Sequence, residues 1–187
     1  VSKLNLRLHE LTAPPGRLER VTVDTGAVGP VVLVDYAHTD DALASALRAV
    51  RPLVPGGGRL WVVFGCGGDR DAKKRPRMGA VASSLADRIV ITSDNPRSEA
   101  PGAIIEAIAR GIDASLRENV VEEADRAKAI HHAIHEAKES DLILIAGKGH
   151  EDYQVVSNGA GGTVRRDFDD RKVARQALQD RMAAAVS

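Results

Sequence analysis

Three things are missing from this sequence of 187 residues, and each absence excludes a class of protein. Cys66 is the single cysteine, which excludes an internal disulfide framework and fits a reducing cytoplasm. No apolar run approaches the roughly 18 residues that a membrane-spanning helix needs. Lysine plus arginine and aspartate plus glutamate both number 26, so no basic surplus predicts nucleic-acid binding. We therefore expect a cytoplasmic protein with neither a membrane nor a nucleic-acid partner.

Two nucleotide-binding motifs are missing as well. No stretch has the G-x-x-x-x-G-K-[ST] spacing of a Walker-type ATP site, although the loop around Lys148 resembles one superficially. The run from Gly65 to Arg70 approaches the G-x-G-x-x-G dinucleotide fingerprint, but Arg70 stands where the third glycine belongs. A nicotinamide site is therefore disfavoured. The glycines still allow a ligand to approach the backbone closely, and Arg70 could then hold an anion.

What the sequence does contain is an alternation of apolar strands with helical patterns. Continuous apolar runs are typical of strands buried on both faces of a parallel sheet. Apolar residues recur between them at helical spacing, as in Leu43, Leu47 and Val50. The alternation predicts an α/β domain with a mostly parallel sheet flanked by helices. We expect strands near 20–24, 31–34, 60–64, 88–92, 120–121 and 141–146, helices from 39 or 40 and over about 77–86, 101–112 and 124–138, a hairpin of 153–156 with 163–166, and a last helix over 168–185.

Four of the apolar strands end in loops that are rich in functional groups. The carboxyl ends of parallel strands share one edge of a sheet, where ligands bind in open α/β folds. We therefore expect the four loops to converge, and that convergence is a stronger signal than any single loop. The loops are Asp35-Tyr36-Ala37-His38, Gly65 to Asp71, Ser93 to Ser98, and Gly147 to Glu151.

The central stretch is the loop Ser93 to Ser98. Asp94, Asn95 and Arg97 supply a carboxylate, an amide and a guanidinium within four residues, and Pro96 fixes the backbone between them. The combination suits a zwitterion, with the aspartate for an ammonium group and the arginine for a carboxylate. The same residues are ordinary in a helix-capping turn, so both interpretations stay open on spacing alone.

Other polar residues are weaker candidates. Glu151 could accept an ammonium group or could be a solvated carboxylate. His38 follows a strand and lies near Asp35. His131 and His135 have a spacing that can bind a metal ion, but no clear third ligand accompanies them, so a solvated helix face is the better interpretation. No metal site is expected.

Six short segments also occur in a distinctive order. They are Gly16-Arg17-Leu18-Glu19, Val34-Asp35-Tyr36-Ala37-His38-Thr39, Phe64-Gly65-Cys66-Gly67-Gly68-Asp69-Arg70-Asp71, Lys74-Arg75-Pro76, Asp94-Asn95-Pro96-Arg97, and Ala146-Gly147-Lys148-Gly149-His150-Glu151-Asp152-Tyr153. Together they resemble the C-terminal domain of the Mur ligases, most of all the members that add diaminopimelate. The resemblance runs from about residue 12 to the end.

The resemblance implies a three-domain, ATP-dependent ligase of peptidoglycan synthesis that adds meso-diaminopimelate to UDP-MurNAc-L-Ala-D-Glu. In that family an N-terminal domain holds the UDP-sugar substrate, and a central domain carries the ATP phosphate loop and the magnesium ligands. A Rossmann-like C-terminal domain brings the incoming amino acid. We therefore expect residues 1–15 to be a linker from a missing central domain and residues 16–187 to be the amino-acid-binding domain. ATP and Mg²⁺ would bind mainly to the missing part, and this chain alone would be inactive.

The resemblance also implies a binding site. Arg70, Asp94, Asn95, Pro96, Arg97, Gly147 and Glu151 match the positions that bind meso-diaminopimelate. Arginines would meet its carboxylates, while Glu151 and the Gly147 carbonyl would meet an ammonium group. Lysine-adding relatives differ at the Asp-Asn-Pro-Arg motif, which makes Arg97 the expected specificity residue. Arg17, Asp35 and His38 match positions that reach the nucleotide when the domains close.

Two departures from the family pattern are visible. Asp40 stands where a proline commonly follows Tyr-Ala-His-Thr, and Ala72-Lys73 leaves no glycine before Lys-Arg-Pro. Neither touches the diaminopimelate positions. Three alternatives remain open: a ligase domain that selects L-lysine, a stand-alone module that binds amino acids or nucleotides, and a nicotinamide-dependent oxidoreductase domain.

Overall fold

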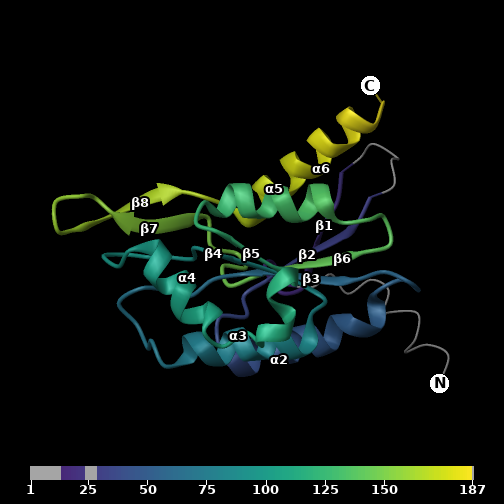
Figure 1. Ribbon diagram of the computed structural model, residues 1–187. Helices are drawn as coiled ribbons and strands as arrows, with labels where there is room; N and C mark the ends of the chain where they lie inside the picture. The colour runs from purple at the N-terminus through teal and green to yellow at the C-terminus, as the bar shows by residue number, and fades with distance from the viewer. Residues whose placement is uncertain (1–13, 24–28, 187) are drawn as a thin grey trace, which may run out of the picture.

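The computed structural model describes residues 14–23 and 29–186 (Figure 1). The expected linker, residues 1–15, lies almost entirely outside the described residues. Six strands form one sheet in the order β1-β2-β6-β3-β4-β5, and β7 pairs with β8 in a separate hairpin. Strand β1 is antiparallel to β2, and the other neighbours in the large sheet are parallel. The prediction of a mostly parallel α/β sheet with a C-terminal hairpin is confirmed.

The observed elements follow the expected order closely. The strands are β1 (Glu19–Val21), β2 (Val31–Asp35), β3 (Leu60–Phe64), β4 (Arg88–Thr92), β5 (Val120–Glu123), β6 (Leu142–Ala146), β7 (Tyr153–Ser157) and β8 (Thr163–Asp167). The α-helices are α2 (Asp40–Val50), α3 (Lys74–Leu85), α4 (Pro101–Ala109), α5 (Arg126–Glu136) and α6 (Asp170–Val186). Short 3-10 helices cover Arg51–Leu53 and Ala114–Asn119.

Helices cover both faces of the sheet. Figure 1 shows α2, α3 and α4 on one side and α5 and α6 on the other. Because successive side chains of a strand point to opposite faces, each strand feeds two cores. Leu33 and Val62 pack with the α2–α4 side, whereas Val32 and Val63 pack with the α5–α6 side. This double burial explains why these strands are continuously apolar rather than alternating.

The path of the chain determines where the functional loops meet. Strands β3, β4 and β5 are laid down in succession, and α5 then carries the chain back across the opposite face. Strand β6 inserts between β2 and β3, so it is hydrogen-bonded to both. The carboxyl ends of β2, β6, β3 and β4 are therefore neighbours, and their loops share one edge of the sheet.

Local signals account for where two helices begin. The Thr39 hydroxyl caps α2 by accepting a hydrogen bond from the Ala42 N–H at 3.2 Å. Asp40, which departs from the family pattern, begins that helix and pairs with Arg77 at 2.9 Å. Helix α3 begins at Lys74, three residues earlier than predicted, because Pro76 is tolerated in a first helical turn.

At the opposite edge of the sheet, one buried carboxylate, that of Asp141, connects the segments where β3 and β6 begin. Asp141 accepts hydrogen bonds from the backbone N–H groups of Arg59 (2.8 Å) and Lys138 (3.0 Å) and from the indole N–H of Trp61 (2.9 Å). The Arg59 guanidinium adds an ion pair at 3.0 Å. Burial opposes the charge of Asp141, but the hydrogen bonds from Lys138, Trp61 and Arg59 outweigh it and lower the pKa.

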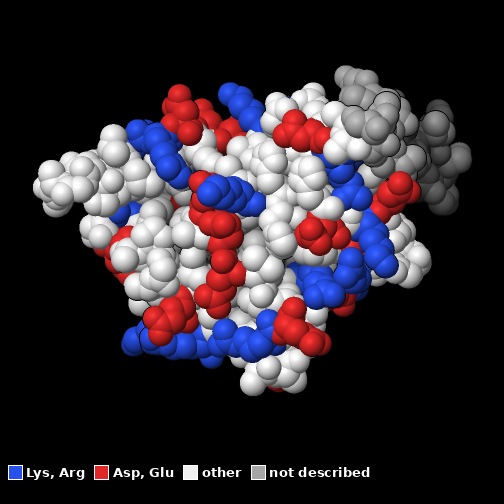
Figure 2. All heavy atoms as spheres, turned by 45° about the horizontal axis from the view of Figure 1, so that its top comes forward, with Lys and Arg blue, Asp and Glu red and all other residues white. Residues whose placement is uncertain are grey.

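Charges of both signs alternate over the surface. Figure 2 shows basic and acidic side chains interspersed on the face it presents, in agreement with the equal counts of 26 each. Within residues 14–23 and 29–186, no helix is both long and apolar enough to cross a bilayer.

We expect Asp141→Ala to lower the free energy of unfolding by about 2–4 kcal/mol, because it leaves the buried Trp61 indole N–H and the half-buried donors of Arg59 without an acceptor. Urea denaturation would measure the loss, with the exposed Asp167→Ala as control. Since the pKa of Asp141 is lowered by folding, the difference should be full above about pH 4, the ordinary aspartate value. It should shrink as the pH falls through the lowered pKa. A difference that does not depend on pH would contradict this account.

Candidate functional site

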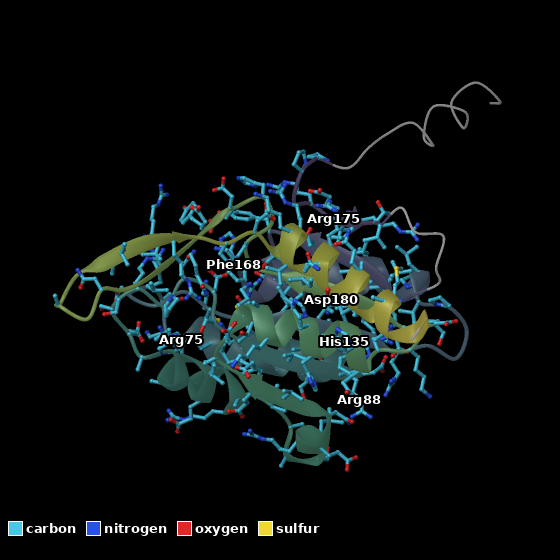
Figure 3. All side chains as sticks on the ribbon, turned by 90° about the horizontal axis from the view of Figure 1, so that it is seen from above. Arg75, Arg88, His135, Phe168, Arg175 and Asp180 are labelled. Atoms are coloured by element: carbon cyan, nitrogen blue, oxygen red, sulfur yellow. The ribbon has the colours of Figure 1, made fainter. Side chains whose placement is uncertain are left out.

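A cavity of about 490 Å³ opens where the loops after β2, β3, β4 and β6 meet. Its lining comes from four loops that are far apart in the sequence, as the predicted convergence requires. The lining residues are Tyr36, His38, Thr39, Gly65, Gly67, Arg70, Asp71, Lys74, Asp94, Asn95, Arg97, Gly147 and Glu151. Figure 3 looks down on the molecule, with Arg75 near this edge and Arg88, the first residue of β4, toward the opposite one.

The loop after β4 is held by the C-terminal hairpin. The Gln154 amide donates to the Asp94 carbonyl at 2.6 Å, and the Val155 N–H donates to Asn95 Oδ1 at 2.8 Å. In return, the Arg97 N–H donates to the Val155 carbonyl at 3.0 Å. Asp94 and Asn95 are each only 7% exposed, so their polar groups lie in the floor of the cavity rather than in solvent.

The Asp94 carboxyl is buried in this floor, and its pKa is shifted. Burial raises its pKa above the ordinary aspartate value, while the charges of Arg126 and Lys148 lower it in part. A Cβ atom on Gly147 would lie 2.5 Å from Asp94 Oδ2, so only glycine allows the two loops to approach this closely. A cation entering the cavity would relieve the cost of the buried negative charge.

Two arginines face the same cavity. Arg97 adopts a left-handed backbone with φ of 53°, and its Nη1 donates to the Gly68 carbonyl at 2.8 Å. The guanidinium is thereby aimed by the neighbouring loop and retains further N–H donors. Arg70 is exposed and extends from the loop after β3. A guanidinium presents its donors in a fork that matches a carboxylate, so this wall suits an anionic group.

A set of ion pairs and hydrogen bonds joins the loops that carry these two arginines. Asp69, also left-handed with φ of 53°, accepts hydrogen bonds from the Ser98 N–H and hydroxyl at 3.1 and 2.7 Å. Glu99 accepts from the Asp69 N–H at 2.6 Å and pairs with both terminal nitrogens of Arg75 at 2.8 and 2.9 Å. The hydrogen bond from Ser98 lowers the pKa of Asp69, and that from Arg75 lowers the pKa of Glu99. The spacing of the arginines is therefore built into the fold.

The third wall contains Gly147 and Glu151. Gly147 has φ of 122°, which side chains rarely adopt, and its N–H donates to the Asp35 carbonyl at 3.1 Å. Glu151 Oε2 accepts from Asn95 Nδ2 at 3.1 Å and from Lys148 Nζ at 3.2 Å. Glu151 is thus an ordered, paired carboxylate and not the solvated one that the sequence left open.

The loop after β2 forms the far side of the cavity. Asp35 uses both carboxylate oxygens to fold the chain, accepting from the Leu18 N–H at 2.9 Å and the Ala37 N–H at 2.8 Å. Tyr36 packs against His38, with ring centroids 4.7 Å apart, and against His150 at 5.4 Å. Burial, and then the nearby carboxylates, raise the pKa of Tyr36, so its hydroxyl stays neutral.

The cavity gathers seven of the ten residues singled out from the sequence: His38, Arg70, Asp94, Asn95, Arg97, Gly147 and Glu151. Pro96 is buried and lines a separate, smaller cavity beside Gln154. Asp35 supports the cavity from behind through its backbone and carboxylate, and Arg17 is exposed on the neighbouring turn.

Sequence reasoning gave no role to several residues of this region, four of which have charged or aromatic side chains in or beneath the cavity. Tyr36 and Lys74 line the cavity, and Lys74 donates to the His38 carbonyl at 2.7 Å. Lys148 and Arg126 lie fully buried beneath it. The first three stand inside motifs that had already been singled out. Arg126 shares a helical face with the apolar Ile130 and Ile134, and an arginine on a buried face is the signal that could have revealed it.

Outside the cavity, the other candidates have ordinary surroundings. His131 and His135 stack with ring centroids 6.1 Å apart, and His131 lies 4.0 Å from Asp180. No cluster of three or more metal-ligating side chains occurs in the described part of the chain. Burial raises the pKa of the Cys66 thiol to about 12, so little of it ionises to the reactive thiolate.

We expect Gly68→Ala to disturb the alignment of the two arginine loops, because the added Cβ would overlap the Pro96 carbonyl oxygen. The free energy of unfolding should fall by about 1–3 kcal/mol, the usual cost of overpacking. Gly102→Ala in α4 is the matched control, since a Cβ there meets nothing within 4 Å. That control should leave stability unchanged or raise it by up to about 1 kcal/mol. Equal melting temperatures for the two variants would contradict the tight packing of Gly68 against the Pro96 carbonyl.

Asp94→Asn should stabilise the domain at neutral pH, because the pKa of Asp94 is raised and its charge therefore opposes folding. The advantage should be present above the raised pKa. It should shrink as the pH falls through the raised pKa and disappear below the ordinary aspartate value of about 4, where Asp94 is protonated in both states. Unfolding curves across this range would measure it, and a variant less stable at pH 7 would contradict the prediction.

The chain is similar to known proteins in both sequence and structure. Residues 16–149 match the family described as "Mur ligase, glutamate ligase domain". The chain is 54% identical over 167 residues to the UDP-N-acetylmuramoyl-L-alanyl-D-glutamate–2,6-diaminopimelate ligase of Synechococcus sp. (strain WH7803), covering 88% of this chain and 32% of that protein. It is 52% identical over 163 residues to the ligase of the same name from Chromobacterium violaceum, covering 87% and 31%.

A solved structure of a UDP-N-acetylmuramoyl-L-alanyl-D-glutamate–2,6-diaminopimelate ligase superimposes with a TM-score of 0.79 and 40% identity. The match covers 94% of this chain and 34% of that one. The chain therefore spans about a third of the length of the relatives it matches. The family match extends over more than half of the chain, over three of the four loops of the cavity in full, and over Gly147 to Gly149 of the fourth. This chain belongs to the Mur ligase family, as a C-terminal domain.

Proposed function

We propose that this chain is the amino-acid-binding domain of an ATP-dependent ligase that adds meso-diaminopimelate to UDP-MurNAc-L-Ala-D-Glu during peptidoglycan synthesis. Residues 16–187 form that domain, and residues 1–15 link it to the preceding one. The observation that carries the proposal is the charge layout of the cavity. Asp94 lies against Gly147 in the loop that carries Glu151, whereas the Arg97 guanidinium donates to Gly68 in the loop that carries Arg70.

That layout fits an amino-acid head group. An α-amino acid carries an ammonium and a carboxylate on the same carbon, so its binding site needs both signs of charge within a few ångströms. Asp94, Glu151 and the Gly147 carbonyl meet the ammonium group, Asn95 supplies an amide, and Arg97 with Arg70 meets the carboxylate. Pro96 shapes the loop from behind. meso-Diaminopimelate carries two such heads, whereas L-lysine carries one.

The second head distinguishes the two amino acids. When one head is held in the cavity, the other amino group of diaminopimelate is free to attack. Lysine would have to use its single head, or offer a bare ammonium group that leaves Arg97 without a carboxylate partner. An unpaired guanidinium in a partly buried site is costly. Arg97 is therefore the principal specificity residue of the proposed site.

Reaction requires the rest of the ligase. ATP supplies the activation of the D-glutamate side-chain carboxylate as an acyl phosphate, and Mg²⁺ accompanies it on the central domain. This chain's part is to hold the amino acid so that its free amine reaches the activated carbon, a gain in effective concentration. Arg17, Asp35 and His38 form the edge that turns toward the nucleotide. The isolated chain is therefore inactive in ligation.

A stand-alone binding module for amino acids or nucleotides is the second candidate. The cavity alone would serve that role equally well, and a natural reading frame restricted to these residues would favour it. A nicotinamide-dependent oxidoreductase is disfavoured by Arg70, which stands where the dinucleotide fingerprint has its third glycine, and by the match to the Mur ligase family.

The test is an NMR titration of the isotope-labelled chain with meso-diaminopimelate and, separately, with L-lysine. Shifts of the amides of residues 94–97 and 147–151 with diaminopimelate alone would support the proposal. Equal shifts with lysine would overturn the selectivity while leaving an amino-acid site. No shift with either would count against the proposed site in this chain.

We expect Arg97→Gln to weaken binding of meso-diaminopimelate by about tenfold to a hundredfold, the loss of charge-assisted hydrogen bonds to a carboxylate. Weak lysine binding should change little. Arg175→Gln on the exposed face of α6 is the matched control and should bind as the wild type does. If Arg97→Gln retained full affinity, the specificity role of Arg97 would be lost.

A further inference from the structure

Lys148 is a charged side chain that the proposed binding scheme does not use. It lies between Gly147 and Gly149, which have positive φ angles of 122° and 54°. The residue is fully buried, with an exposure of 0%. Burying an ammonium group costs free energy unless the group is paired and hydrogen-bonded. The partners of Lys148 therefore indicate its role.

The partners of this ammonium are two proposed ligand-binding residues. Lys148 Nζ lies 3.2 Å from Glu151 Oε2 and 3.4 Å from Asn95 Oδ1. The ring of Tyr153 lies beside it, with its centroid 5.4 Å from Nζ. Lys148 does not line the cavity and acts from behind the residues that do.

These contacts determine which way the Asn95 amide faces. Its Oδ1 accepts from the Val155 N–H at 2.8 Å as well as from Lys148, so that end of the amide is an acceptor of two donors. Its Nδ2 consequently points to Glu151 Oε2, at 3.1 Å. Within the described residues, Glu151 Oε1 accepts no hydrogen bond. One carboxylate oxygen is thus committed to the protein and the other is left for a ligand.

The same ammonium group balances the charge beneath the cavity. Arg126 and Asp170 form a fully buried pair at 2.7 Å, and Lys148 offsets Glu151. Asp94 is the remaining buried carboxylate of this cluster. One uncompensated negative charge matches one incoming ammonium group. Without Lys148 the floor would carry two uncompensated negative charges, and a single ammonium group of a ligand would not neutralise both.

We propose that Lys148 is a positioning residue that orients Asn95 and Glu151 and sets the charge of the site for one ammonium group. The proposal rests on the proposed amino-acid-binding function. Lys148 touches no substrate in this scheme, and its effect is exerted through the two residues it contacts.

The experiment uses Lys148→Ala in the labelled 187-residue chain, with Lys138→Ala, an exposed residue just after α5, as control. We expect meso-diaminopimelate affinity to fall at least tenfold in Lys148→Ala, the usual effect of losing a charge-assisted hydrogen bond, and to stay at the wild-type value in the control. Added ethylammonium should occupy the vacated space and restore binding. Ethanol, which is neutral and of similar size, should not.

The side-chain amide signals of Asn95 provide a readout that needs no ligand. They should shift in Lys148→Ala and return with ethylammonium. Wild-type affinity in Lys148→Ala, or equal rescue by ethanol, would overturn the proposal, because packing alone would then explain the residue. If Lys148→Ala fails to fold, Lys148→Met keeps the apolar stem without the charge, and the same losses are expected of it.

The two proposals can fail separately. If the wild-type chain binds no meso-diaminopimelate, the proposed function fails, and the Asn95 signals still decide the role of Lys148. If the wild type binds and both Lys148 variants bind equally well with unchanged Asn95 signals, only the role of Lys148 is overturned.

Discussion

One buried guanidinium, that of Arg126, holds the ligand-facing edge of this domain together. It pairs with Asp170 at 2.7 Å and donates to the carbonyl groups of Ser93 and Ala146 at 3.1 and 3.0 Å. Ser93 directly precedes Asp94, and Ala146 directly precedes Gly147, so a single side chain fixes two loops of the site against α6. A buried ion pair adds little stability when compared with an apolar replacement, but losing one partner strands the other at a cost of about 3–5 kcal/mol. The pair therefore specifies geometry more than it adds stability.

The carboxylates around the cavity differ in how far the protein compensates their charges. Asp94 is buried with its pKa raised, which means that the folded chain bears a cost that a bound cation would remove. Glu99 and Asp69 have lowered pKa values because they are satisfied within the protein. The two paired carboxylates align the loops, whereas Asp94 lies in the floor of the cavity. Such a division is common at functional sites, where stability is given up for binding.

Much of the fold could be predicted from the sequence because its signals are local. Continuous apolar runs marked β3, β4 and β6, and the alternation of strands and helices indicated the parallel sheet. The convergence of the loops followed from the sheet rule, and the ordered motifs indicated the family. Glu151 was left ambiguous because its pairing depends on Lys148 and Asn95, which only the folded loops bring together. The left-handed backbone at Asp69 and Arg97 could not be predicted either, since neither position is a glycine, the residue that usually marks such a conformation.

The small hairpin of β7 and β8 determines how readily the loop after β4 can open. Its strand β7 makes the hydrogen bonds that hold Asp94, Asn95 and Arg97, while its partner β8 is exposed along its whole length. An isolated two-stranded hairpin is marginally stable in water, so this element belongs to the part of the fold that opens most readily. Opening it would release the loop after β4 without unfolding the six-stranded sheet. Under the proposed function, the lifetime of a bound amino acid would depend on the local unfolding of this peripheral hairpin and not on the stability of the core.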